Sequence, residues 1–308
     1  MQHSGLVSLT SRVAAVVLLL LGAVAAGIAE PKRPPPQATA KVRVYTLDCG
    51  HLFFYDMGLF SDTGEYDGQR GAMPVPCFLI RHPKGDLMWD TGFGDLTARQ
   101  LQDMYGPFGI LATPRTPLTR QLAALGVSPD QVEYLALSHL HADHAGGANL
   151  FPRSTWLLYR NEIAWATATP APSGVAPALF SAYRTAKVEW LNDNDHDVFG
   201  DGSVRILRAS GHSAGHAVLM LQLARAGTVI LSGDLAHTLQ SHKHRRVPLT
   251  NYSRAETLAS FDRVDKLIAN RQGRLIVQHS PEHFAALPKP PPSSTESGPA
   301  PPKIKTVR

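Results

Sequence analysis

The feature that most constrains this chain is a six-residue segment, 139–144, in which four residues are of types that bind metal ions. Its sequence is His139-Leu140-His141-Ala142-Asp143-His144. Residues 134–138 form an apolar, strand-like run before it, and Gly146 and Gly147 allow a tight backbone turn after it. Alternate side chains of an extended segment point the same way, so these ligands can divide between two cations. We therefore expect a buried strand whose end presents a metal site.

Imidazole and carboxylate groups in this number suit zinc or, less specifically, iron, manganese or cobalt. An isolated His is more often a surface or hydrogen-bonded residue. That interpretation is kept for His3, His51, His82, His196, His242, His244 and His283. A closed structural zinc site is the alternative, but such sites are usually rich in Cys, and both cysteines of this chain lie far from the segment in sequence.

Three further segments place candidate ligands directly after strand-like runs. They are Gly211-His212-Ser213-Ala214-Gly215-His216, Ser232-Gly233-Asp234 and Gln278-His279. Together with the first segment, their order and spacing over most of residues 42–285 resemble the metallo-β-lactamase superfamily. The resemblance implies an α/β fold, the αβ/βα four-layer sandwich. It also implies two divalent metal ions per chain, with zinc the first candidate, at one end of two sheets.

The same resemblance implies a role for each candidate residue. One metal ion is assigned to His139, His141 and His212, the other to Asp143, His144 and His279, and Asp234 is assigned as the ligand that bridges both. His216 and Asp90 are expected beside the site, where each would orient a neighbouring group through a hydrogen bond. For Asp90, an ordinary turn carboxylate is the alternative.

Residues 48–85 are similar to the N-acyl-homoserine lactonases, the quorum-quenching group of the superfamily. The similarity rests on Asp48-Cys49-Gly50, on residues 60–69 and on residues 75–85. It implies a hydrolase that opens the lactone ring by attack of a metal-bridging hydroxide, with Asp143 passing a proton to the leaving oxygen. That group often has Tyr three residues after the bridging Asp. This chain has His237 there, which would hold the carbonyl or amide of the substrate.

The expected partner is a small molecule, an acylated lactone, and several alternatives stay open. The residues Leu52, Phe53, Phe54, Tyr55, Met57, Leu59 and Phe60 either line a pocket for an acyl chain or pack the core beneath a loop. Another ester, a thioester, a phosphoester or a β-lactam would suit the same metal site. A non-catalytic binding module would be expected to lack at least one ligand, and none is missing. A homodimer is compatible with the sequence.

The two ends of the chain differ in composition from its centre. Arg12 and the apolar run 13–29 are typical of a secretory signal peptide, which places the protein in the periplasm or outside the cell, without stable membrane insertion after cleavage. An uncleaved membrane anchor is the alternative. Residues 30–40 are expected to form a linker, residues 41–287 the hydrolase domain, and residues 288–308, with their many prolines, a disordered tail.

The formal net charge of +5 comes from these ends, because acidic and basic residues balance over positions 41–287. The domain therefore lacks the excess of basic residues that nucleic-acid-binding domains carry, and no nucleic-acid partner is expected. The chain has two cysteines, Cys49 and Cys77. They either form one disulfide in an oxidising compartment or stay as inert core residues.

Strand-like runs with few helical segments fill the domain. Strands are expected at residues 42–47, 77–80, 86–89, 134–138, 155–158, 204–207, 217–223, 228–232 and 274–278. Helices are expected from Pro117 to Gly126 and after the capping box Ser253-x-x-Glu256. Residues 49–76 are expected to form a long irregular loop. This order of elements suggests two sheets with helices outside them.

Overall fold

The computed structural model describes residues 42–192 and 194–289. The signal peptide and linker expected at the start of the chain lie outside the described residues, as does the tail expected at residues 288–308 apart from its first two residues. In the described ranges, every helix is too short or too polar to cross a bilayer.

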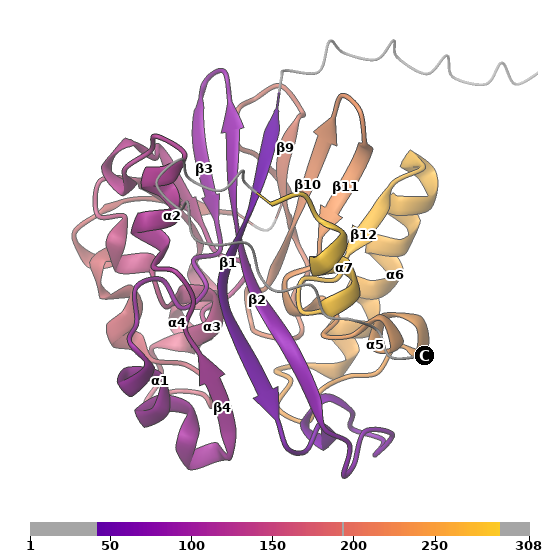
Figure 1. The fold of residues 1–308 in the computed structure, drawn as a ribbon. Helices are drawn as coiled ribbons and strands as arrows, with labels where there is room; N and C mark the ends of the chain where they lie inside the picture. Colours follow the sequence, from indigo (N-terminus) through magenta and orange to yellow (C-terminus); the bar gives the residue numbers. More distant parts are fainter. Residues whose placement is uncertain (1–41, 193, 290–308) are drawn as a thin grey trace, which may run out of the picture. The chain divides into compact units, whose positions relative to one another are not determined.

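Two β-sheets pack face to face in the centre of residues 42–289 (Figure 1). The first has the order β4-β1-β2-β3-β5-β6-β7 and consists of β1 (Arg43–Phe54), β2 (Gly71–His82), β3 (Gly85–Trp89), β4 (Ile110–Thr113), β5 (Tyr134–Ala136), β6 (Thr155–Tyr159) and β7 (Lys187–Leu191). The second has the order β12-β11-β10-β9-β8 and consists of β8 (His196–Asp197), β9 (Val204–Arg208), β10 (Ala217–Leu223), β11 (Gly227–Leu231) and β12 (Arg274–Ile276).

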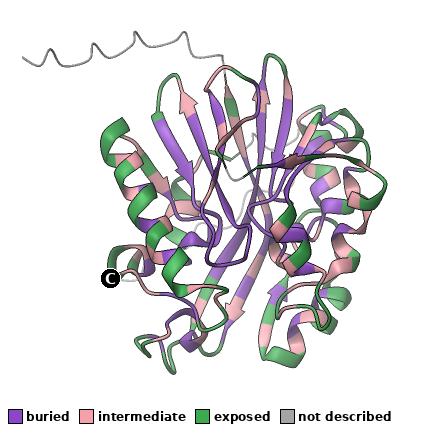
Figure 2. Ribbon diagram, turned by 180° about the vertical axis from the view of Figure 1, so that it is seen from behind, coloured by how far each residue is buried: buried purple, intermediate pink, exposed green. Residues whose placement is uncertain are grey.

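Helices cover the outer face of each sheet (Figure 1). The first sheet carries α1 (Ala98–Tyr105), α2 (Leu118–Ala124), α3 (Ala142–Ala145) and α4 (Arg160–Ala166), and the second carries α5 (Leu239–His244) and α6 (Arg254–Arg271), while α7 (Pro281–Ala286) follows β12. Figure 2 shows that the strands are mostly buried and that the outward sides of the helices are exposed. The layers are thus helices, sheet, sheet and helices, which confirms the expected α/β sandwich.

Strand β2 shows why the centre of the sequence is so apolar. Successive side chains of a strand point to opposite faces. Cys77 and Leu79 pack in the core beneath the helices of the first sheet, whereas Phe78 and Ile80 pack in the core between the two sheets. Because both faces are covered, the segment is an unbroken apolar run rather than an alternating one.

The prediction of an irregular loop over residues 49–76 is wrong at both ends of that range. Strands β1 and β2 continue into it as one long antiparallel hairpin, with a register shift between Asp48 and His51. Pro74 and Pro76, which argue against a central strand, pair beside this shift, and Gly50 takes the positive φ of 145° there. The bulge accommodates prolines that lack an N–H, so the irregular part shrinks to residues 55–70.

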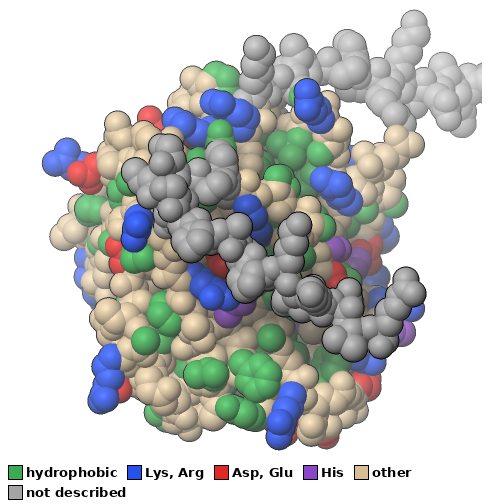
Figure 3. Space-filling model, in the orientation of Figure 1, with side chains coloured by type: hydrophobic (Ala, Val, Ile, Leu, Met, Phe, Trp, Pro, Cys, Tyr) green, Lys and Arg blue, Asp and Glu red, His purple; other side chains and the backbone are tan. Residues whose placement is uncertain are grey.

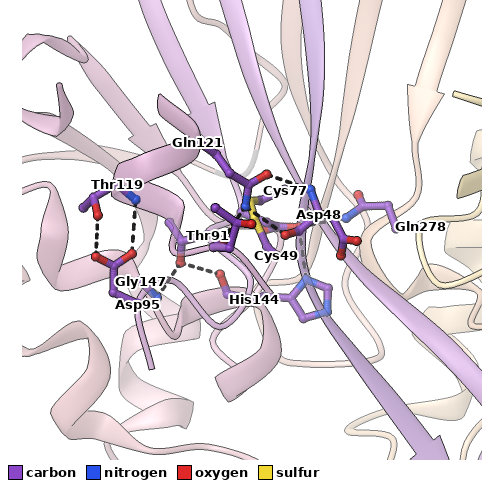
Figure 4. The surroundings of a disulfide bond; sticks show 12 residues. Asp48, Cys49, Cys77, Thr91, Asp95, Thr119, Gln121, His144, Gly147 and Gln278 are labelled. Atoms are coloured by element: carbon purple, nitrogen blue, oxygen red, sulfur yellow. Dashed lines mark hydrogen bonds and ion pairs between the residues drawn. A yellow bond between two sulfur atoms is a disulfide. The ribbon is translucent and has the colours of Figure 1, made fainter. Parts of the chain in front are cut away.

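Cys49 and Cys77 form a disulfide between β1 and β2, which selects one of the two alternatives left open by the sequence (Figure 4). The disulfide packs against the loop that follows β3. Gly92 approaches Cys49 so closely that a Cβ atom at position 92 would lie 2.2 Å from the Cys49 Cβ. Thr91, next to it, donates its hydroxyl to the carbonyl of His144 over 2.9 Å. The disulfide therefore supports the loop that holds a candidate metal ligand.

The remaining expectations agree with the structure in part. The strand expected at 217–223 and the helices after Pro117 and Ser253 are present, and the Ser253 hydroxyl accepts the N–H of Glu256. Strand β12 ends two residues earlier than expected, before the turn that carries the next polar residues. Helices α1, α3, α4, α5 and α7 and strands β4, β7 and β8 were not expected.

Candidate metal centre

Seven His and Asp side chains meet at one end of the two sheets, each in a segment that follows a strand. His139 and His141 follow β5, Asp143 and His144 lie in α3, His212 lies between β9 and β10, Asp234 lies in the short 3-10 helix η6 (Gly233–Leu235) after β11, and His279 follows β12. β3 and β5 are parallel, as are β11 and β12. Parallel strands end at the same edge of a sheet, which is why these segments converge.

The first ligand group consists of His139, His141, His212 and Asp234. Nδ1 of His141 lies 2.8 Å from Nε2 of His139 and 3.0 Å from Nε2 of His212. Oδ2 of Asp234 lies 3.3 Å from Nε2 of His212 and 3.6 Å from Nε2 of His139. Three imidazoles and one carboxylate oxygen thus surround one point.

The second ligand group consists of Asp143, His144 and His279. Nε2 of His144 lies 3.1 Å from Nε2 of His279, and each of these nitrogens is 3.6 Å from Oδ2 of Asp143. Oδ1 of Asp234 reaches this group, at 2.9 Å from His279 and 3.1 Å from His144. One oxygen of Asp234 therefore faces each group, which is the geometry of a bridging carboxylate.

The donor sets fit transition-metal ions. In a tetrahedral zinc site with bonds of about 2.0–2.1 Å, neighbouring ligand atoms lie roughly 3.3–3.4 Å apart. The close contacts described above within the two groups, 2.8 to 3.6 Å, bracket that distance. Nδ1 of His141 faces two other ring nitrogens at once, and a shared proton can satisfy only one such contact. A cation at the common point satisfies all three nitrogens.

Burial and the Asp234 carboxylate shift the pKa values of the imidazoles in opposite directions in the two ligand groups. Burial lowers the pKa of His139 and His212 well below the ordinary value and lowers that of His141 as well, so these rings are neutral, the form that binds metal. Burial is the largest influence on His144 and His279 and opposes their charge, but the neighbouring carboxylates, Asp234 foremost and Asp143 with it, together raise both pKa values. Burial opposes charge on Asp234 in turn, yet the imidazoles hold its pKa well below the usual range.

Asp90 and His216 lie beside the ligands, as the resemblance implies. Oδ2 of Asp90 is 3.0 Å from Nδ1 of His144 and accepts hydrogen bonds from the Ser138 hydroxyl and the Gln278 side-chain amide. Nε2 of His216 accepts the backbone N–H of Asp234 over 2.9 Å. Such contacts fix the orientation of metal-binding groups.

Ser138, Gln278 and Glu162, which also support this region, were not predicted from the sequence. Ser138 and Gln278 each directly precede a ligand in sequence, which is the one signal that could have identified them. Glu162 lies in α4, far from every ligand motif, and a single acidic residue after a strand carries no comparable signal.

A cavity of about 870 Å³ opens above the ligands. Its floor includes His141, Asp143, His212, Asp234, His237 and His279, and its wall includes Leu52, Phe54, Leu59, Phe60, Met73, Met104, Phe108 and Ile110. A polar floor bearing the candidate ligands thus adjoins an apolar wall.

The apolar stretch before residue 61 divides between the two roles that the sequence left open. Leu52, Phe54 and Tyr55 line the cavity, but Phe53 does not, since strand alternation turns its side chain to the other face of β1. Met57 is buried in the core beneath the loop and its sulfur packs toward Gly71. The acyl-pocket interpretation is therefore wrong for Phe53 and Met57.

His237 lies in the cavity, three residues after Asp234. Its Nε2 is 3.0 Å from Oδ2 of Asp234, and its ring centroid is 4.8 Å from that of Phe60. The imidazole thus joins the polar floor to the apolar wall.

Residues 70–279 match the family described as the metallo-beta-lactamase superfamily. The chain belongs to this superfamily. Among curated members, it is 29% identical over 262 residues to the N-acyl homoserine lactonase AttM of Azorhizobium caulinodans, covering 81% of this chain and 97% of AttM. It is 25% identical over 215 residues to the N-acyl homoserine lactonase AiiA of Bacillus thuringiensis subsp. kurstaki, covering 68% of this chain and 82% of AiiA.

Solved structures share the metallo-β-lactamase fold with this chain. An N-acyl homoserine lactone hydrolase with the product N-hexanoyl-L-homoserine bound at its catalytic metal center superposes with a TM-score of 0.71 at 23% identity, covering 82% of this chain and 98% of that one. AidC, a dizinc quorum-quenching lactonase, superposes with a TM-score of 0.62 at 18% identity, covering 79% and 89%. The superfamily fold thus extends over nearly the whole length of these lactonases.

Proposed function

We propose that this chain is a dinuclear metal-dependent hydrolase that opens the lactone ring of N-acyl-homoserine lactones. One observation carries the proposal: two ligand groups that share Asp234 form the floor of a cavity with an apolar wall. An acylated lactone has the matching parts, a polar ring with its ester carbonyl and a hydrocarbon chain. The names of the relatives point to the same substrate class.

Exposed apolar side chains around the cavity support an amphiphilic substrate. Among the described residues, the large hydrophobic side chains that are exposed are Tyr55, Phe108, Leu111, Leu249 and Tyr252. Tyr55, Phe108 and Leu249 line the cavity. Figure 3 shows hydrophobic side chains gathered at the lower end of the molecule, where β1 ends. Such a rim suits entry of an acyl chain.

The two ligand groups would hold two divalent cations, zinc by the chemistry of the donors, and these would supply an activated water and polarisation of the ester carbonyl. The residues of the chain position the reactants around that chemistry. Asp143 lines the cavity and is part of the second ligand group, so its carboxylate is placed to pass a proton to the departing ring oxygen. We assign to His237, which lines the cavity, the donation of a hydrogen bond to the carbonyl or amide oxygen of the substrate.

We also propose export to the periplasm or to the outside of the cell. Two features support this location: the signal-peptide composition of residues 1–29 and the disulfide between Cys49 and Cys77, since disulfides persist in oxidising compartments. The homodimer stays a prediction that size-exclusion chromatography with light scattering tests.

The proposed activity is tested with the mature, metal-loaded protein. Ring opening of a lactone releases one proton, which a pH indicator follows directly. N-hexanoyl- and N-decanoyl-homoserine lactone are compared with a chromogenic β-lactam, a glutathione thioester and a phosphodiester, and protein stripped of metal by a chelator serves as the control.

We expect the highest kcat/KM for an acyl-homoserine lactone, loss of turnover after stripping, and recovery on addition of zinc. A far higher kcat/KM for one of the other substrates would contradict the lactonase proposal and leave the metal centre intact. Fewer than two metal ions per chain after reconstitution would contradict the dinuclear centre itself.

A further inference from the structure

Glu162 is a buried carboxylate that the proposed chemistry does not use. It lies in the first turn of α4, directly after β6, and is 4% exposed. Burial raises its pKa to about 7, although its hydrogen bonds act in the opposite direction. Placing a carboxylate in such a site is unfavourable unless it has a specific set of donors.

The two oxygens of Glu162 hold two different ligand loops. Oε1 accepts the backbone N–H of Leu140, the residue between His139 and His141, over 2.9 Å. Oε2 accepts the hydroxyl of Ser213 and the N–H of Gly215, each over 2.7 Å, and these residues lie one and three positions after His212. One carboxylate therefore spans the loop after β5 of the first sheet and the loop before β10 of the second.

The surrounding packing leaves little freedom in this contact. A Cβ atom on Gly215 would lie 2.6 Å from the Glu162 Cβ, so the loop approaches α4 as closely as a glycine permits. The neighbouring Asn161 donates its side-chain amide to the carbonyl of Ala214 over 2.6 Å. Both side chains at the start of α4 thus bind the loop that carries His212.

We infer that Glu162 is a positioning residue that sets the spacing of His139, His141 and His212, and hence the affinity of the first ligand group for its metal ion. The inference rests on the metal centre of the proposed function and not on its substrate. The second ligand group has no contact with Glu162 among the hydrogen bonds of the described residues.

Glu162→Gln tests this with almost no change in shape. A carboxamide offers one oxygen and one NH₂ group in place of two oxygens. If the NH₂ faces Leu140, it meets a backbone N–H. If it faces the other loop, Ser213 can accept, but the N–H of Gly215 loses its partner. Either orientation leaves a backbone donor unpaired beside one of the two ligand loops.

The measurement is metal retention by the zinc-loaded mature protein against a chromophoric chelator, which withdraws the two ions in turn. We expect one zinc ion of Glu162→Gln to be held about 10–100-fold more weakly, the range typical of groups that orient metal ligands, and the other to change by less than about threefold. Glu133→Gln is the matched control, because Glu133 accepts the N–H of Asp86 where β3 begins, at the opposite end of the sheet from the ligands. It should retain both ions like the wild type.

Circular dichroism shows whether Glu162→Gln is folded. Should it fail to fold, Ser213→Ala removes a single one of the three hydrogen bonds, and it is expected to weaken the same zinc ion by about threefold to tenfold. Equal weakening of both ions, or unchanged retention of both, would overturn the inference and leave the proposed function standing. A wild-type chain that binds no zinc would overturn the metal centre and the inference with it.

Discussion

Lengthening the acyl chain of the substrate is expected to raise kcat/KM stepwise until the chain reaches the rim of the cavity. Transfer of one methylene group from water to an apolar environment contributes about 0.8 kcal/mol, which corresponds to about fourfold in kcat/KM. At the rim, Phe108 and Leu249 are 65% and 64% exposed, so a methylene there keeps part of its contact with water. We expect a gain of roughly two- to fourfold per methylene from butanoyl to octanoyl chains and a smaller gain beyond.

Two neighbouring residues of β4 provide a matched pair of variants. Ile110 lines the cavity, whereas Leu111 points away from it and is 46% exposed. Ile110→Ala should lower kcat/KM for long chains by about tenfold and for the butanoyl chain by much less, because the lost contact is with the chain. Leu111→Ala should leave the whole series within about twofold of the wild type. Proton release at substrate concentrations far below KM gives kcat/KM for each chain length.

A flat series would refute this reasoning. If kcat/KM changes by less than about twofold between butanoyl and decanoyl chains, the chain gains nothing from the apolar wall. Equal effects of Ile110→Ala and Leu111→Ala would show that the loss comes from the strand rather than from the cavity.

Two further variants and one mass measurement have defined outcomes. Asp234→Asn should lower kcat/KM by about a hundredfold or more and release metal from both groups, since loss of an orienting contact alone costs 10–100-fold; elemental analysis and the proton-release assay measure this, and turnover close to wild type would contradict the bridging role. Replacing Cys49 and Cys77 by Ala should lower the free energy of unfolding by about 3–4 kcal/mol, from the loop of 28 residues that the disulfide closes. Urea unfolding checks this value, and two free thiols in the oxidised wild type would contradict it. The exported protein should begin near residue 30, and an intact mass that includes Met1 would favour a membrane anchor instead.

The candidate ligands could be predicted from the sequence because their chemistry has a short-range pattern. His139, His141, Asp143 and His144 lie within six residues, and His212, Asp234 and His279 each follow a strand-like run. The structure brings all seven together in two groups. The spacing of ligands on one loop is a local property of the sequence. The division of distant ligands between two metal ions came from the resemblance to the superfamily.

Other parts of the site depend on contacts that have no local pattern. Pro74 and Pro76 are unfavourable residues for a central strand, and the register shift opposite them in β1, which has no local pattern in the sequence, accompanies their place in β2. The role of Glu162 could not be predicted from the sequence for a similar reason. Its role arises from the closeness of two loops that are 73 residues apart in sequence, at His139 and His212, and from a helix that neither loop contains.

The position of Asp234 between the groups follows from how the two sheets close on each other. The N–H of Ala217, at the start of β10, donates to the carbonyl of Ser138 over 2.8 Å, so the segments after β5 and before β10 are joined directly. Gly233 has a φ of 50°, and a Cβ atom there would lie 2.6 Å from Nε2 of His216 and 2.7 Å from the Ser138 Cβ. Because Gly233 has no side chain, the backbone of η6 can enter the narrow junction of the sheets. The carboxylate of Asp234, the next residue, then reaches one metal-binding group with each of its oxygens.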